Sequence, residues 1–102
     1  EPPLIGSTAF ERAETDMWIR RVETGLGTPV GLFWQHGHPL TAKLVNQVPG
    51  MGDAARAQAL AMLGWFDGQL TGHDWLAGDR FTLADIALIS IVDFAGWIGL
   101  AM

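Results

Sequence analysis

The feature that most limits how this chain can fold is a run near its end, from Thr82 to about Trp97, that shows no polar face at helical spacing. A helix that is apolar on every side has to be buried. The segment IALISIV would also suit a buried strand, but the length of the run and the helix-start signal before it favour a helix. We therefore predict a buried helix at the centre of a bundle.

The start signal lies at the threshold of this run. With Thr82 as N-cap, its hydroxyl can accept a hydrogen bond from the Asp85 amide, while the Asp85 carboxylate accepts one from the Thr82 amide. Phe81 and Ile86 then occupy the two positions of a hydrophobic staple. Asp85 could instead be an acid in a cleft or a solvated charge, but the capping box accounts for it better. We predict that losing either capping side chain lowers stability without removing a catalytic group.

Asp93 is harder to explain, because it lies close to the same side of this helix as Ile86. Burying a carboxylate without partners costs free energy, so the group must be paired, protonated or at the rim of the core. We predict a paired structural role, with a rim position as the alternative.

The first half of the chain carries a second helical pattern, from Ser7 to about Gln35, in which apolar residues recur in steps of three and four. Ser7 or Thr8 can cap its start. Pro29 lacks an amide donor and lies among glycines, so we predict a kink near residues 25–29.

The middle of the chain is helical again after a short interruption. Residues 39–50 hold two prolines and are typical of a turn or half-formed helix, and a third helical pattern runs from about Met51 to Thr71. No window shows a sustained alternation typical of strands. The sequence predicts an all-α fold, a helical bundle with a long kinked first helix and a buried central helix.

Composition narrows the functions. The net charge is −5 and the only adjacent basic pair is Arg20–Arg21, which argues against a nucleic-acid partner. The absence of cysteine excludes disulfides and a cysteine nucleophile. His36, His38 and His73 lack metal-ligand spacing, so we expect no metal. We expect the five tryptophans to supply core and interface bulk, and no segment to span a membrane.

Four stretches together resemble a known family. EPPLIGST leads into a long helix containing ETDMW, followed by QVPGMGDAARAQALAMLGWFDGQL and by WLAGDRFTLADIAL. From about Leu4 to Leu100 the chain resembles the all-helical C-terminal domain of cytosolic glutathione S-transferases of the bacterial sort. The most specific element is Gly-Asp-x-Phe-Ser/Thr-x-Ala-Asp, which in that family is a folding motif with a capping box and staple. It is matched by Gly78, Asp79, Phe81, Thr82, Ala84 and Asp85.

The resemblance implies a domain organisation. Residues 1–7 would be the linker from a preceding thioredoxin-like domain, and residues 8–102 the helical domain, incomplete at its C-terminus. In the family the preceding domain binds glutathione and supplies the catalytic Tyr, Ser or Cys. We therefore expect no catalytic residue and no cofactor in this chain, glutathione as a co-substrate bound mainly elsewhere, and no activity from the fragment alone.

The resemblance also assigns a site and partners. The wall of an apolar co-substrate pocket falls near Gly25, Thr28, Pro29 and Leu32; alternatively, the glycines only permit close helix packing. The implied protein is a cytoplasmic homodimer that conjugates glutathione to a hydrophobic electrophile, with Trp18, Arg20 and Arg21 near the partner subunit or Trp18 in the core. The alternatives are a non-catalytic protein-interaction module, or a glutathione-dependent reductase, isomerase or dehalogenase on the same scaffold.

Overall fold

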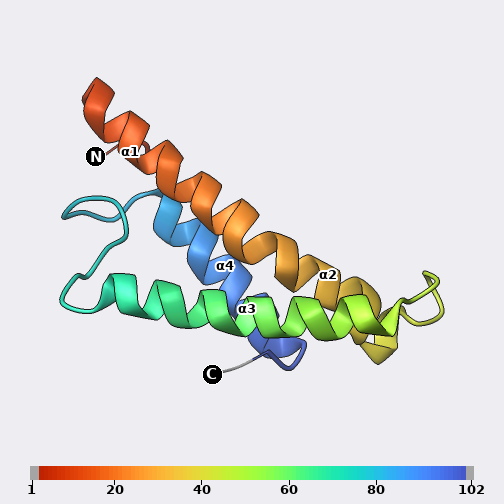
Figure 1. Ribbon diagram of the computed structural model, residues 1–102. Coiled ribbons are helices and arrows are strands. Elements are labelled where there is room, and N and C mark those ends of the chain that lie inside the picture. The colour runs from red at the N-terminus through yellow and green to blue at the C-terminus, as the bar shows by residue number, and fades with distance from the viewer. Residues whose placement is uncertain (1–2, 101–102) are drawn as a thin grey trace.

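A computed structural model describes residues 3–100, and all of its regular structure is helical. Helix α1 spans Ala9–Arg20, the π-helix η1 spans Arg21–Gly27 and α2 spans Thr28–Gly37. A short 3-10 turn, η2, covers Pro39–Thr41, and two longer helices follow: α3 over Pro49–Leu70 and α4 over Leu83–Trp97 (Figure 1). The prediction of an all-α bundle is confirmed.

The first long helix is continuous through the region of the predicted kink. Thr8 caps its start, and the residues that join α1, η1 and α2 all keep helical backbone angles. Because Pro29 has no amide to donate to the carbonyl four residues earlier, the helix needs another bonding pattern here. The chain widens into the π-helical segment η1, and the Thr28 amide donates five residues back to the Glu23 carbonyl.

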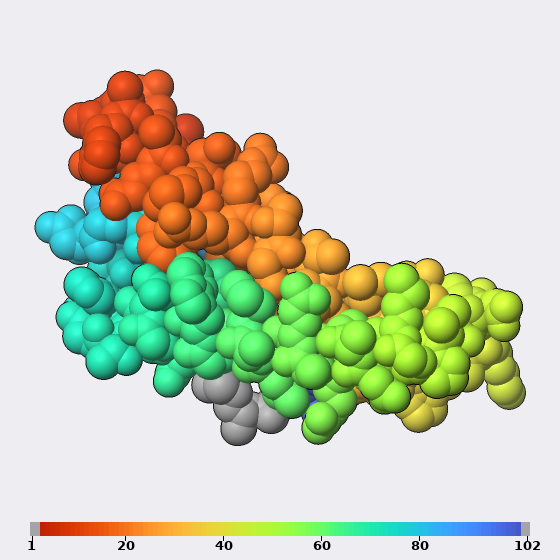
Figure 2. All heavy atoms as spheres, in the orientation of Figure 1, coloured from red at the N-terminus to blue at the C-terminus, as the bar shows by residue number. Residues whose placement is uncertain are grey.

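Helix α2 lies beside the first part of α3 at one end of an elongated molecule of 46 × 26 × 18 Å, and α3 continues along most of its length (Figures 1 and 2). Their backbones approach closely where Gly52 meets the end of α2. A Cβ atom added at Gly52 would lie 2.8 Å from the His36 carbonyl oxygen and 2.9 Å from the Gly37 backbone. Only glycine leaves room for this crossing.

Helix α4 packs on α1 and η1, as Figure 1 shows. Its buried residues are Ala84, Asp85, Leu88 and Ala95, which share one face. The prediction of a helix buried on every side is wrong: Ile89 is 54% exposed and Trp97 is 68% exposed. In the part of the chain that the structure describes, α1 and η1 cover one side of α4 and leave the opposite apolar side open.

The core lies between the first long helix, the second half of α3 and the buried side of α4. Val22 and Leu26 from η1 are fully buried, and they join Trp18 and Val30 with Ala59, Leu63, Phe66, Leu88 and Ala95. No helix in the described residues is long and apolar enough to cross a membrane.

The segment ahead of α1 is held against α4. The Leu83 amide donates to the Leu4 carbonyl over 2.9 Å, so an amide at the start of α4, which has no partner within the helix, finds one in the predicted linker. Gly6, with φ near +100°, makes the turn from this segment into α1.

Candidate functional site

The buried polar group at the start of α4 is the Asp85 carboxylate, which is 6% exposed. Its Oδ2 accepts from the Thr82 amide over 2.9 Å, and the predicted capping box between Thr82 and Asp85 is confirmed. Its Oδ1 accepts from the Leu76 amide over 3.0 Å. The sequence did not predict this second bond, because nothing in the pattern around Leu76 indicates that its backbone amide lies next to Asp85. Asp85 therefore ties the loop before α4 to the first turn of the helix.

The Thr82 hydroxyl completes the cap. It closes the capping box with Asp85 and accepts a 3.2 Å bond from the Ala84 amide. Phe81 is exposed, and its ring packs against that of Trp75 in an edge-to-face arrangement, with centroids 5.4 Å apart. The contact between Phe81 and Ile86 stays a prediction.

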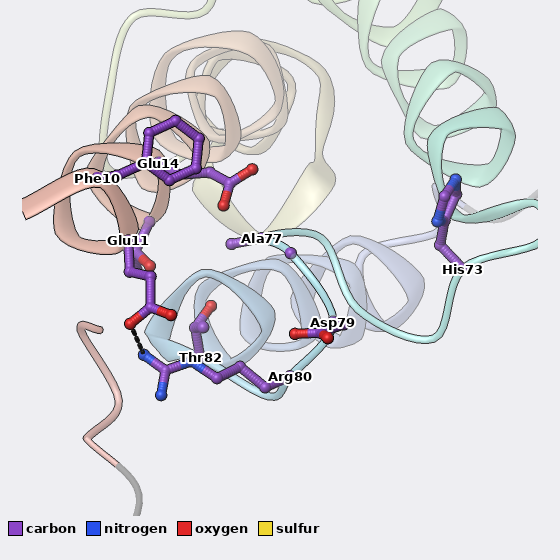
Figure 3. Close-up of a pocket in the computed structure, with 10 residues that line it drawn as sticks. Phe10, Glu11, Glu14, His73, Ala77, Asp79, Arg80 and Thr82 are labelled. Carbon is purple, nitrogen blue, oxygen red and sulfur yellow. Dashed lines mark ion pairs between the residues drawn. The ribbon is translucent and has the colours of Figure 1, made fainter. Parts of the chain in front are cut away.

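A cavity of about 470 Å³ opens between the first turns of α1 and the loop before α4 (Figure 3). The sequence of either segment alone does not predict this cavity, because it forms only where the two segments meet in the fold. Most of the residues that line it are polar or charged. The lining residues are Phe10, Glu11, Glu14, Thr15, His73, Ala77, Gly78, Asp79, Arg80 and Thr82.

One ion pair crosses this cavity, from Glu11 to Arg80, with Oε1 and Nη2 3.3 Å apart (Figure 3). The same Glu11 oxygen accepts from the amides of Ser7 and Thr8, at 2.8 and 3.2 Å. These backbone bonds, Ser7 first, lower the pKa of Glu11, with a smaller contribution from the Arg80 charge. A carboxyl held ionised can anchor a structure but is a poor proton donor, so Glu11 serves as an anchor between α1 and the loop.

The four residues predicted to line a substrate pocket do not take part in this cavity. Gly25 faces α3, since an added Cβ atom would lie 2.9 Å from the Met62 side chain, and Pro29 is fully buried in the core. Thr28 is exposed and Leu32 is half-buried. For Gly25 the structure thus shows the close packing that was the alternative. The assignment of the four to a pocket wall stays a prediction.

Trp18 is a core residue. It is 8% exposed, its ring centroid lies 6.0 Å from that of Trp65, and the Arg21 guanidinium stacks 4.7 Å above it. Arg20 is exposed and pairs with Asp16 and Glu23 on its own helical path.

Asp93 lies on the open side of α4, exposed to solvent. Among the described residues it takes part in none of the side-chain hydrogen bonds or ion pairs. A structural role with partners inside this chain is therefore not seen among the described residues, and the exposure of Asp93 agrees with a rim position. What Asp93 faces there stays a prediction. Because no described element covers this side of α4, the Asp93 carboxylate stays accessible to solvent.

A cluster of aromatic side chains joins α2 to the end of α4, and the sequence pattern did not predict it. The Trp34 ring contacts Phe94 and Trp97, with centroids 5.4 and 5.8 Å apart. His38 lies on Trp34 as well, at 5.0 Å. No group of three residues able to hold a metal occurs in residues 3–100.

Comparisons with known proteins agree with this architecture. Residues 31–101 match the family model for the glutathione S-transferase C-terminal domain. Glutathione S-transferase 2 of Saccharomyces cerevisiae is 33% identical over 96 residues, which cover 92% of this chain and 41% of that protein. FtsZ-localized protein A of Caulobacter vibrioides is 33% identical over 101 residues, which cover 94% of this chain and 44% of that protein.

Solved structures give the same result. The crystal structure of Gtt2 from Saccharomyces cerevisiae matches with a TM-score of 0.86 and 32% identity, covering 98% of this chain and 49% of that one. A glutathione S-transferase domain-containing protein of Marinobacter aquaeolei matches with a TM-score of 0.84 and 30% identity, covering 100% and 51%. The chain thus spans about half the length of these relatives or less.

Proposed function

We propose, from the premise that this chain belongs to the glutathione S-transferase family as its C-terminal domain, that it is the helical part of a dimeric glutathione transferase. The observation that carries the proposal is the match to yeast Gtt2 over nearly the whole chain. The finer parts of the proposal are the thioredoxin-like partner domain, the electrophile, the homodimer and a cytoplasmic location.

The proposed reaction is the attack of the glutathione sulfur on an electrophilic carbon. A carbon–sulfur bond forms, the leaving group departs with its electron pair, and the thiol proton is lost to solvent or to a base in the preceding domain. This chain contains no Cys and no Tyr. Its contribution would be to hold the electrophile in position and to exclude water.

The wall that would hold the electrophile lies on α2, just after the π-helical segment. π-Helical segments occur often at functional sites, because they re-aim the side chains that follow. Leu32 and Thr28 follow η1 on turns that the core leaves partly open. The aromatic rings of Trp34, Phe94 and Trp97 continue the apolar surface toward the end of α4.

The first experiment measures glutathione binding and turnover by the full-length protein. We expect it to bind immobilised glutathione and to consume a chlorodinitrobenzene-type electrophile. Leu32→Ala should raise KM for the electrophile roughly tenfold and leave KM for glutathione unchanged. The matched control is Leu44→Ala, since Leu44 is 78% exposed at the far end of the molecule. Equal effects of both variants would remove Leu32 from the proposed wall.

The surface proposed for the second subunit is the outer side of α1. Phe10 is 74% exposed there and, with Ala13, Glu14 and Met17, borders an apolar groove of about 290 Å³. Exposed apolar patches of this kind mark association sites, and a twofold dimer needs a self-complementary patch. Phe10→Glu should shift the full-length protein toward monomer in sedimentation, whereas Leu44→Glu should not.

A non-catalytic association module is the second candidate. The observation that favours it is the Caulobacter relative, whose name places it with FtsZ rather than with a substrate. A full-length protein that neither binds glutathione nor consumes the electrophile, yet keeps its fold, would support this candidate against the transferase.

A further inference from the structure

The connection between α2 and α3 is fastened by two histidines that act as hydrogen-bond acceptors. His36 Nδ1 accepts from the Val48 amide over 3.1 Å, and His38 Nδ1 accepts from the Leu40 amide over 3.1 Å. Val48 is the N-cap residue of α3, and Leu40 lies in the η2 turn. Both imidazoles are half-buried, so protons from solvent can reach them.

These two bonds determine which nitrogen carries a proton. A ring nitrogen that accepts an N–H bond must present its lone pair, so each of these two bonds requires a neutral ring with its hydrogen on Nε2. Protonation of Nδ1 would turn the acceptor into a donor that faces another N–H. Each bond must therefore break when its ring becomes an imidazolium. Histidine is the side chain that ordinarily undergoes this change between about pH 5 and 8.

The other bonds in the connection do not titrate in this range. The Thr41 hydroxyl, which is 4% exposed, lies within bonding distance of the Gln35 and His38 carbonyls. The Gln47 amide donates to the His38 carbonyl over 2.7 Å. Within the described residues, the Leu40 and Val48 amides have no acceptor other than the imidazoles. Acid should therefore release these two amides first.

Charged groups on neighbouring elements do not replace the lost acceptors. Lys43 belongs to the connection, Asp53 and Arg56 lie on the first turns of α3, and Asp93 lies on α4 beside the ring that contacts Trp34. All four are exposed, and none takes part in an ion pair in residues 3–100. The response to pH therefore depends on the two rings and their backbone partners.

We propose that His36 and His38 make the α2–α3 connection a pH-sensitive clasp, closed when both rings are neutral and opened by their protonation. Opening frees the N-cap amide of α3 and the η2 turn. The His38 ring also contacts Trp34, which packs on Phe94 and Trp97. The proposal of the clasp does not rest on the proposed transferase activity, although Trp34 is also placed beside the proposed wall.

The test uses nuclear magnetic resonance on the full-length protein labelled with nitrogen-15. At about pH 8 the ring shifts of His36 and His38 should show the tautomer with hydrogen on Nε2. Between about pH 8 and about pH 5, amide exchange at Leu40 and Val48, corrected for its intrinsic pH dependence, should rise roughly tenfold. Core amides such as that of Leu63 should show no matching rise.

Variants separate the two rings. Asparagine places an amide oxygen where histidine has Nδ1 and does not titrate, so His36→Asn should remove the pH response at Val48 alone and His38→Asn that at Leu40 alone. His73→Asn is the matched control and should keep both responses. Unchanged exchange at both amides through the titration, or hydrogen on Nδ1 at about pH 8, would overturn the clasp. The measurements on the unsubstituted protein decide the matter if a variant fails to fold.

Discussion

Two helices of this molecule begin with the same four-residue device in different surroundings. At the start of α1, Thr8 and Glu11 exchange capping bonds where Thr8 is exposed and Glu11 half-buried. At the start of α4, Thr82 and Asp85 do the same while buried, at 1% and 6% exposure. Both boxes join a threonine N-cap to an acidic residue three positions later, but water has much less access to the second.

The difference shows that burial changes what a cap does. At α1, water can replace a lost capping partner, and the contact of this box with the loop before α4 is a partly exposed ion pair between Glu11 and Arg80. Water has little access at α4, and Asp85 holds the Leu76 amide from outside the helix as well. The buried box is therefore also a tertiary contact, whose loss leaves unsatisfied donors in the core.

The largest expected effect comes from Asp85→Ala. It leaves the amides of Leu76 and Thr82 without acceptors, and we expect a loss of roughly 3 kcal/mol of unfolding free energy. Urea unfolding followed by circular dichroism measures it. Asp93→Ala on the same helix removes an exposed, unpaired carboxylate and should change stability by less than about 0.5 kcal/mol. Similar losses of unfolding free energy in Asp85→Ala and Asp93→Ala would contradict the special role given to the buried capping box.

Thr82→Ala should cost about 1 to 2 kcal/mol, because the Ala84 amide loses its acceptor while Asp85 still holds its other bonds. Thr82→Ser keeps the hydroxyl and should recover most of this loss. The same urea measurement compares the two variants. A serine variant as unstable as the alanine variant would assign the effect to the methyl group.

Thr8→Ala at the exposed box should cost less, about 0.5 to 1 kcal/mol, because water can bond to the Glu11 amide in its place. Thermal unfolding of Thr8→Ala and Thr82→Ala side by side sharpens the comparison. A larger loss at Thr8 than at Thr82 would contradict the role given to burial.

The smallest effect is expected for Glu11→Gln, and it should appear mainly in the pH dependence of stability. The folded-state pKa of Glu11 lies below 4.5, so folding favours the ionised group. Its stabilising contribution is present above the unfolded pKa and is lost as pH falls through the folded pKa. Urea midpoints of Glu11→Gln should lack this part of the acid slope. Glu14→Gln, which removes a carboxylate that accepts none of the described hydrogen bonds, should keep it.

The sequence was sufficient where the structure depends on neighbours along the chain. The start of α4 at Thr82 follows from bonds within one helical turn. For the first helix the sequence predicted Ser7 or Thr8 as the cap, and the structure shows Thr8. The all-α fold follows from apolar spacing, which the helix itself displays. The most specific family motif, from Gly78 to Asp85, includes the capping box of α4. The same residues therefore support both the predicted helix start and the family resemblance.

The sequence was insufficient where the structure depends on what lies alongside. The open side of α4 could not be predicted, because an apolar face does not say whether another element covers it. The cavity unites Glu11 with Arg80 from distant segments, and Gly25 faces Met62 on another helix. The π-helical segment η1 was not predicted either. Pro29 indicates that the regular helical hydrogen bonding is interrupted, but not whether a kink or a π-helical turn results.

The π-helical segment also limits how the chain can change length over evolution. A π-helical turn holds about one residue more than the α-helical path it replaces, so removing one residue within Arg21–Gly27 could restore an ordinary helix. Because the π-helical turn takes up that extra residue, α2 would keep its direction, with Val30 in the core and Gly37 facing Gly52. Removing one residue from the regular helices α1 or α2 would instead turn the rest of the helix by about 100°. We therefore expect one-residue gaps in homologous sequences to fall in η1 rather than in α1 or α2.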